Sequence, residues 1–178
     1  MTMDPLSGRL LLMTPSAQGG FPLETWAWDG HNWFQQHPLT NPRGVMGVAT
    51  DLQAGVALAF GFARPGAPGS LNAVWAWSGA TWVQLAAIPP PGVTVTIESP
   101  PPRGQGWLAY DEADARLVLF GGVGEPGPPL SDTWLWDGSS WSEAHGAGGP
   151  PAGGPMAFDP VTRNVLLVSQ SIGARPSS

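Results

Sequence analysis

The sequence predicts an all-β protein built from repeated units of four short antiparallel strands. A nine-residue aromatic segment occurs at 25–33, at 74–82 and at 133–141, always with the spacing Trp-x-Trp-x-x-x-x-Trp. Its copies contain nine of the ten tryptophans: Trp26, Trp28, Trp33, Trp75, Trp77, Trp82, Trp134, Trp136 and Trp141. The 25 Gly and 21 Pro residues leave little room for helices. Units that repeat in this way bury their apolar faces by stacking on one another.

A second repeated segment consists of an aspartate, a short turn and an aliphatic run. Its four copies begin at Asp4, Asp51, Asp111 and Asp159, which are 47, 60 and 48 residues apart. The period is therefore near 48 residues, and an insertion lies between Trp82 and Asp111. Because an aspartate in a turn accepts hydrogen bonds from backbone N–H groups, we interpret these four residues as turn caps.

Each unit is expected to contain four strands. The first lies before the aspartate, as at 107–110, and the second is the aliphatic run after it, as at 116–120. Unbroken apolar runs of this length are typical of strands covered on both faces. The third strand carries two tryptophans at i and i+2, which project from the same face. The fourth begins at the last tryptophan, after a turn whose glycine supplies the positive φ of a tight hairpin.

Four antiparallel strands in a period near 48 residues predict the blades of a β-propeller. We expect one repeat domain over 1–178, about three to three and a half blades in all. Its parts are a partial blade at 1–42, blades at 43–88 and 103–150, a partial blade at 151–178 and an inserted inter-blade loop at 83–102. The first unit is expected to have three strands and the last unit two. The chain is then a piece of a longer propeller or a half-ring that closes by self-association, and the alternative fold is an irregular sandwich.

Several phrases carry a resemblance to a known family. They are Pro102-Arg103-Gly104, Leu108-Ala109-Tyr110-Asp111, the run from Arg116 to Gly121-Gly122, and Asp132 to Gly138 with Trp141. These phrases resemble the kelch-type, galactose-oxidase-like propeller repeats of bacterial proteins, and the resemblance covers nearly the whole chain. Two departures are that, of the four equivalent positions after the aliphatic runs, only Gly121-Gly122 has the double glycine, and that the last two aromatics are five residues apart instead of seven.

The resemblance does not bring the copper chemistry of galactose oxidase with it. That chemistry relies on tyrosine and histidine ligands and on a tyrosine linked to cysteine, whereas Tyr110 is the only tyrosine here and cysteine is absent. The three histidines show no zinc-ligand spacing. We predict no cofactor, no metal and no catalytic residue, and the sequence favours a protein that is not an enzyme.

The net charge and the length of the apolar stretches restrict the classes of partner that the chain is expected to bind. Thirteen acidic residues against seven basic ones give a net charge of −6, which argues against nucleic acid and anionic membranes. No apolar stretch is long enough for a signal peptide or a membrane span. The compartment stays undetermined: cytoplasmic by default, or secreted if a further N-terminal part carries a signal.

The candidate ligand-binding residues are Trp107, Arg64, Glu98 and Glu125. Trp107 corresponds by the repeat offsets to Gly47 and Pro155, so the repeat itself does not require an aromatic residue there. The other three belong to the long connections, where a rigid scaffold usually presents its binding residues. In contrast, we interpret the nine repeated tryptophans as core, and Arg43 and Arg103 as buried hydrogen-bonding residues.

These observations predict a non-catalytic binding or scaffold module that uses long loops on one face of the propeller. Its partner would be a protein or a glycan. One alternative is carbohydrate binding or processing by the full-length or assembled protein. Another is a purely structural repeat without a ligand.

Overall fold

In the computed structural model every element of the described chain is a β-strand, which confirms the all-β prediction. The structure describes residues 1–16, 23–62, 72–85, 99–124, 127–146, 149–150 and 153–168, with side chains at all of them except Arg43, Phe62 and Asn72. Within these ranges no helix is long and apolar enough to cross a membrane.

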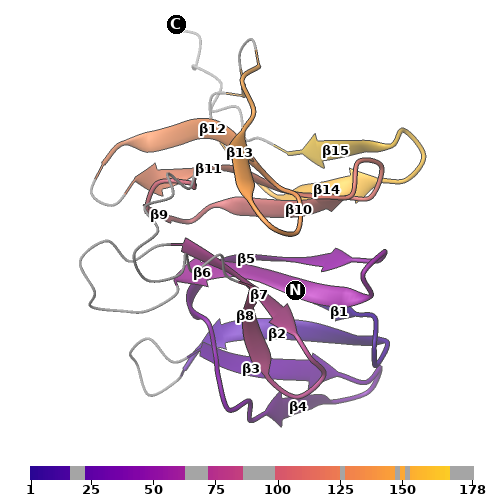
Figure 1. Ribbon diagram of the computed structural model, residues 1–178. Coiled ribbons are helices and arrows are strands. Elements are labelled where there is room, and N and C mark those ends of the chain that lie inside the picture. Colours follow the sequence, from indigo (N-terminus) through magenta and orange to yellow (C-terminus); the bar gives the residue numbers. More distant parts are fainter. Residues whose placement is uncertain are drawn as a thin grey trace, which may run out of the picture.

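The strands form three antiparallel sheets and a hairpin, and within each, apart from β9 in the third sheet, the strand order follows the chain (Figure 1). The first sheet contains β1 (Thr2–Asp4), β2 (Arg9–Pro15), β3 (Leu23–Trp28) and β4 (Trp33–Gln36). The second contains β5 (Arg43–Asp51), β6 (Val56–Phe62), β7 (Asn72–Trp77) and β8 (Trp82–Leu85). The third contains β10 (Trp107–Asp111), β11 (Arg116–Gly124), β12 (Pro129–Trp136) and β13 (Trp141–Glu143), and the two-residue β9 (Arg103–Gly104) pairs with the end of β11. The hairpin contains β14 (Met156–Asp159) and β15 (Asn164–Leu167).

The expectation that residues 1–42 contain only three strands is wrong. Thr2–Asp4 forms β1 and pairs with β2, so the first sheet has four strands. This strand has no apolar run, which is why the sequence pattern missed it. Hydrogen bonds to the second sheet hold it instead: Thr2 Oγ1 lies 2.6 Å from Thr50 Oγ1, and the Met3 N–H donates to Thr50 Oγ1 over 3.0 Å.

The turn after each first strand is built around its aspartate. Oδ1 of Asp4, Asp51, Asp111 and Asp159 accepts a hydrogen bond from a backbone N–H two or three residues later, at 2.8 to 3.1 Å. The fourth residue after each aspartate has positive φ: Gly8 at 67°, Gly55 at 68°, Ala115 at 54° and Arg163 at 56°. The aspartate therefore satisfies backbone donors that the turn leaves without strand partners.

Each sheet has two different faces. We call the face that carries the tryptophans the Trp face and the opposite one the aliphatic face. The aliphatic face of the first sheet, with Leu11 and Ala27, packs on the Trp face of the second, with Trp75, Trp77 and Trp82. The aliphatic face of the second sheet, with Leu58 and Phe60, packs on the Trp face of the third, with Trp134, Trp136 and Trp141. These two interfaces are the hydrophobic core.

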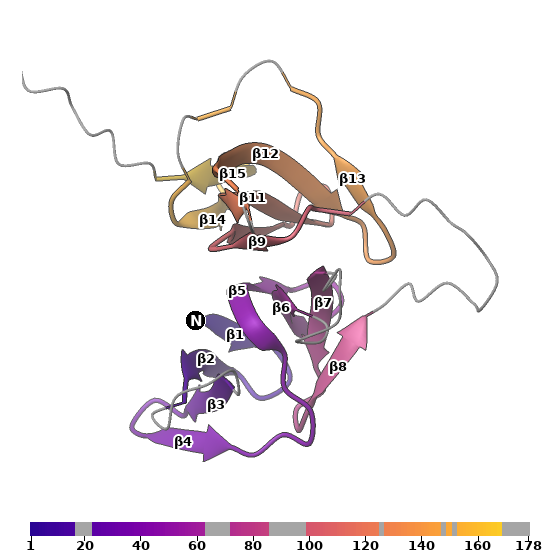
Figure 2. The same cartoon turned by 90° about the vertical axis from the view of Figure 1, so that its left-hand side faces the viewer.

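The sheets are arranged around their first strands. β1 contacts β5, β5 contacts β10, and β10 contacts β14. The fourth strands β4, β8 and β13 lie on the outside of the molecule (Figure 2). Successive four-stranded sheets that pack face to face around their first strands give a β-propeller-like architecture.

Candidate functional site

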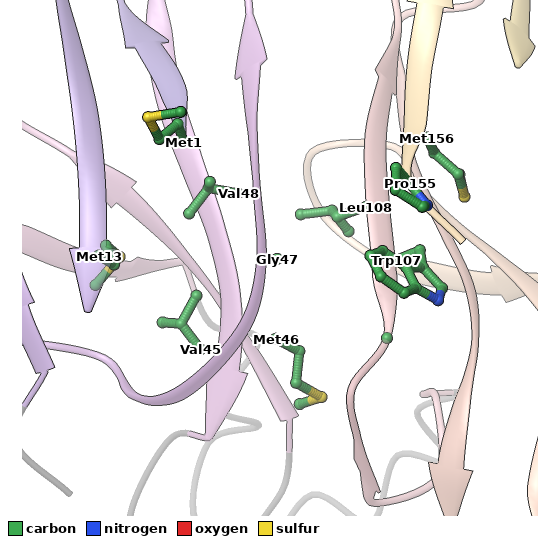
Figure 3. Close-up of a pocket in the computed structure, with 11 residues that line it drawn as sticks. Met1, Met13, Val45, Met46, Gly47, Val48, Trp107, Leu108, Pro155 and Met156 are labelled. Atoms are coloured by element: carbon green, nitrogen blue, oxygen red, sulfur yellow. The ribbon is translucent and has the colours of Figure 1, made fainter. Parts of the chain in front are cut away.

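A cavity of about 290 Å³ lies among the first strands of successive sheets (Figure 3). Its walls come from the starts of β1, β5, β10 and β14 and from the end of β2, and include Met1, Met13, Gly47, Trp107 and Met156. Every first strand ends at its aspartate turn, so the cavity lies at the opposite end of these strands. The connections between units and between second and third strands start or finish at this same end. The cavity is therefore at the end where the sequence places the long loops.

Trp107 is the candidate ligand residue that lines the cavity. It pairs with Phe120 across β10 and β11, as Gly47 pairs with Phe60 across β5 and β6, so the two positions are equivalent. The Trp107 side chain is 36% exposed. No residue of the described ranges accepts a hydrogen bond from its Nε1.

Two close approaches require glycine, one at Gly47 and one at Gly153, which lies against Trp107. A Cβ on Gly47 would lie 2.7 Å from Leu108 Cβ, so only glycine lets β5 come this near to β10. A Cβ on Gly153 would lie 2.3 Å from Trp107 Cδ1 and 2.4 Å from Nε1. The indole therefore lies directly against the Gly153 backbone in the cavity wall.

The side chains of the described walls are apolar. Methionine, valine, leucine and tryptophan side chains line the cavity, and no charged side chain is among the lining residues. Such side chains offer dispersion and ring-stacking contacts, and the polar surface of the cavity comes mainly from backbone groups. Among the described residues, no three His, Cys, Asp or Glu side chains gather into a group that could hold a metal ion.

The other three candidate ligand residues, Arg64, Glu98 and Glu125, lie outside the described residues, as does the side chain of Arg43. The sequence reasoning missed Gly153, because it stands in a Pro- and Gly-rich segment that resembles an ordinary connection. Its signal is the close pairing of a glycine with a non-repeated tryptophan, which only the three-dimensional structure reveals.

Arg103 is fully buried in the third sheet and forms an ion pair with Asp132. Trp134 Nε1 donates to the same carboxylate over 2.7 Å. Burial alone would raise the pKa of Asp132, but the hydrogen bonds from Arg103 and Trp134 and the charge of Arg103 outweigh it and hold that pKa below its usual value. This group joins β9 to β12 within the third sheet.

The double glycine stands next to this ion pair. Gly121 and Gly122 have φ of 60° and 110°. A Cβ on Gly122 would lie 2.9 Å from the carbonyl oxygens of Gly104 and Gln105. The pair therefore lets β11 pass close to β9, which carries Arg103.

The repeated tryptophans differ in burial between sheets. In the second and third sheets they are between 1% and 7% exposed. In the first sheet Trp26 and Trp28 are half-buried and Trp33 is 39% exposed. In the first sheet the residue equivalent to Asp132 is Glu24. Its carboxylate accepts a hydrogen bond from Trp26 Nε1 over 3.1 Å. In the second sheet the equivalent residue is Ala73, and the buried Trp75 Nε1 has no partner in the described part of the chain.

Comparison with family models and with curated proteins gave no match. Among solved structures the chain is similar to YjhT, with a TM-score of 0.50 and 18% identical residues. The similarity covers 84% of this chain and 46% of YjhT, so the chain spans less than half of that protein's length. At this level of identity the likeness concerns the fold alone, and it agrees with the propeller-like arrangement of the sheets.

Proposed function

We propose that the chain is part of a kelch-type β-propeller, about three to three and a half blades in extent, and that it acts as a non-catalytic binding or scaffold module. The kelch-type phrases, the sequential four-stranded sheets and the fold likeness to YjhT support the architecture. No cofactor or metal takes part in this proposal.

Trp107 carries the binding proposal. It is the one tryptophan outside the repeat, its indole lies on Gly153, and it lines a cavity at the long-loop end of the first strands. A rigidly held and partly exposed ring contributes contact area at low entropic cost. The ligand is therefore expected to place an apolar or ring-shaped group in the cavity, with the long loops around it.

A glycan is the second candidate ligand, and the exposed indole is the observation that favours it. Sugar rings stack on partly exposed tryptophan, but a sugar also needs several hydrogen-bonding groups, and Trp107 Nε1 is the one polar side-chain group among the described lining residues. A protein partner that inserts an apolar side chain fits these walls better.

The test is binding to glycan and peptide arrays by wild-type protein, Trp107→Ala and Val123→Ala. Val123 is 40% exposed in the same sheet but does not line the cavity, so it is the matched control. We expect some spots whose binding signal falls at least tenfold with Trp107→Ala and is kept with Val123→Ala. If these spots are peptides, the result favours a protein partner; if they are glycans, it favours a carbohydrate ligand. Binding that is unchanged by Trp107→Ala would remove the cavity from the proposal. A variant with a Gly-Ser turn in place of 88–102 tests the loop in the same way.

A further inference from the structure

Two faces of the stack are covered by no sheet of the described chain. One is the Trp face of the first sheet. The other is the face of the β14–β15 hairpin that carries Leu166 and Val168 and that corresponds, by the repeat register, to the aliphatic face of a sheet. In Figure 1 the first sheet, with β4, lies at the bottom and the hairpin, with β15, in the upper part of the molecule. The two interior interfaces show what each of these faces contacts when it is covered.

The Trp face of the first sheet is exposed, whereas the Trp faces of the second and third sheets are each covered by a neighbouring sheet. Leu10 is 36% exposed, whereas its counterparts Ala57 and Leu117 are fully buried. Trp33 is 39% exposed, whereas Trp82 is 1% exposed. A hollow of about 410 Å³ lies on this face beside Trp26 and Trp33.

The rings on this open face already have the geometry of the buried ones. Trp28 and Trp33 have centroids 5.4 Å apart and planes at 45°. In the corresponding buried pair, Trp77 and Trp82, the ring centroids are 5.3 Å apart and the ring planes are at 56°. The open face is therefore organised in advance for a covering sheet, which lowers the entropic cost of association.

The hairpin presents the matching half. By the repeat register, Leu166 is the counterpart of Leu11 and Leu58, which are 2% and 4% exposed in the interior interfaces. Leu166 itself is 51% exposed. Val168 is 67% exposed and is the counterpart of Phe60, which is fully buried.

One interior contact connects these two halves. Phe60 packs edge-on against Trp141, with ring centroids 5.3 Å apart. The counterpart of Phe60 in the hairpin is Val168, and the counterpart of Trp141 in the first sheet is Trp33. The repeated interface therefore pairs the Val168 position with the Trp33 position.

We propose that a second copy of this chain covers the Trp face of the first sheet with its own β14–β15 hairpin, so that Val168 of one copy lies against Trp33 of the other. The same contact at both ends joins two copies head to tail in one closed ring. The similarity covers 46% of YjhT, so two copies of this chain together have about the length of that one chain. The inference rests on the repeated interface and does not depend on a ligand at Trp107.

The test is the solution mass of residues 1–178, measured by light scattering after gel filtration. We expect about twice the chain mass of 18.6 kDa. Trp33→Lys and Leu166→Lys each place a charge in the interface, and each should raise the dissociation constant about 100-fold or more. Phe34→Lys is the control, because Phe34 is 46% exposed in the same strand but projects from the opposite face. Near-ultraviolet circular dichroism checks that all variants keep their packed tryptophans.

Mixing the two interface variants makes the test directional. A Trp33→Lys copy keeps a working hairpin and a Leu166→Lys copy keeps a working Trp face, so the mixture should form a dimer held by one interface. A monomeric wild type would overturn the proposal and leave the Trp face to a sheet from a different chain segment. A dissociation constant left unchanged by Leu166→Lys would also overturn it, because the hairpin would then take no part in the dimer contact. A series of growing oligomers would overturn ring closure.

Discussion

The guanidinium of Arg103 and the carboxylate of Asp132 form a two-pronged ion pair, with both N–O distances at 2.7 Å. The Arg103 Nη1 also donates to the Gly121 carbonyl over 2.9 Å, and its Nε donates to the Pro101 carbonyl over 3.2 Å. The pair connects β9 with the start of β12 and with the double glycine of β11. It is the centre of a hydrogen-bond network that only the third sheet contains in full among the described residues.

Asp132→Ala is expected to destabilise the protein by about 3–5 kcal/mol, because it leaves a buried guanidinium without its counter-ion. Urea unfolding followed by tryptophan fluorescence measures this change. Glu24→Ala is the matched control, since Glu24 binds the equivalent Trp26 but pairs with no arginine of the described ranges. Its cost should stay near about 1 kcal/mol. Equal losses for the two variants would show that the ion pair adds nothing to the tryptophan hydrogen bond.

Gly122→Ala is expected to cost more than Gly30→Ala. The two glycines have similar positive φ, 110° and 102°. A Cβ on Gly30 would meet nothing within 4 Å, whereas a Cβ on Gly122 would meet two carbonyl oxygens at 2.9 Å. Both variants carry the backbone strain of about 1–3 kcal/mol, and only Gly122→Ala adds a clash between main-chain segments. Thermal unfolding of the two variants compares them, and equal melting temperatures would contradict the close approach of β9 and β11.

Because the sequence repeats, most strands and the core residues could be predicted from it. The Trp-x-Trp spacing placed one face of each third strand, and the recurring aspartates located the turns. β1 could not be predicted, because it has no apolar pattern and is held by hydrogen bonds to Thr50 of the second sheet. A strand that depends on a neighbouring sheet leaves no local signal.

Only part of the candidate site could be predicted from the sequence. Trp107 stood out because the repeat does not require it. Its contact with Gly153 joins residues 46 positions apart, and the ion pair of Arg103 joins residues 29 positions apart. Neither spacing follows from the period, so only the folded chain shows them. The burial of Trp33 was overestimated for a related reason: its position is core only where another sheet covers it.

Trp134→Phe is expected to cost more than Trp75→Phe, although the two tryptophans occupy equivalent positions and are both 7% exposed. Trp134 Nε1 donates to Asp132 over 2.7 Å, whereas the buried Trp75 Nε1 has no partner in the described part. Both variants lose similar ring volume, but only Trp134→Phe loses a hydrogen bond to a charged group, worth about 1.5–3 kcal/mol. Chemical unfolding gives the difference directly, and a larger loss for Trp75→Phe would show that its indole N–H has an acceptor after all.

Gly153→Ala is expected to move the Trp107 indole out of the cavity wall. The added methyl group would lie 2.3 Å from Cδ1, far inside contact distance, so the ring must turn away. Labelling with 5-fluorotryptophan and recording fluorine NMR spectra follows the ring, and Trp107→Phe assigns its signal. Gly146→Ala is the control, because a Cβ there would meet nothing within 4 Å. An unshifted Trp107 signal in Gly153→Ala would contradict the packing of the ring on Gly153.

Tyr110 is expected to ionise two pH units above an ordinary tyrosine. It is 8% exposed between the second and third sheets, and burial, followed by the hydrogen bond and charge of Asp51, raises its pKa to about 12. The chain has a single tyrosine and neither lysine nor cysteine, so no other side chain has an ordinary pKa near 10. Tyrosinate absorbance during an alkaline titration therefore reports this one hydroxyl.

The same shift predicts how stability depends on pH. The folded state favours neutral Tyr110, so its contribution is complete below the ordinary pKa of 10 and declines as the unfolded chain releases the proton. Between pH 10 and about 12 the free energy of unfolding should fall by about 1–3 kcal/mol. Asp51→Asn removes the charge beside the hydroxyl and should lower the Tyr110 pKa and flatten this decline, while the buried ring keeps the pKa above 10. A Tyr110 that titrates near 10 in the folded wild type would show that the hydroxyl is open to water and that the second and third sheets are not closed around it.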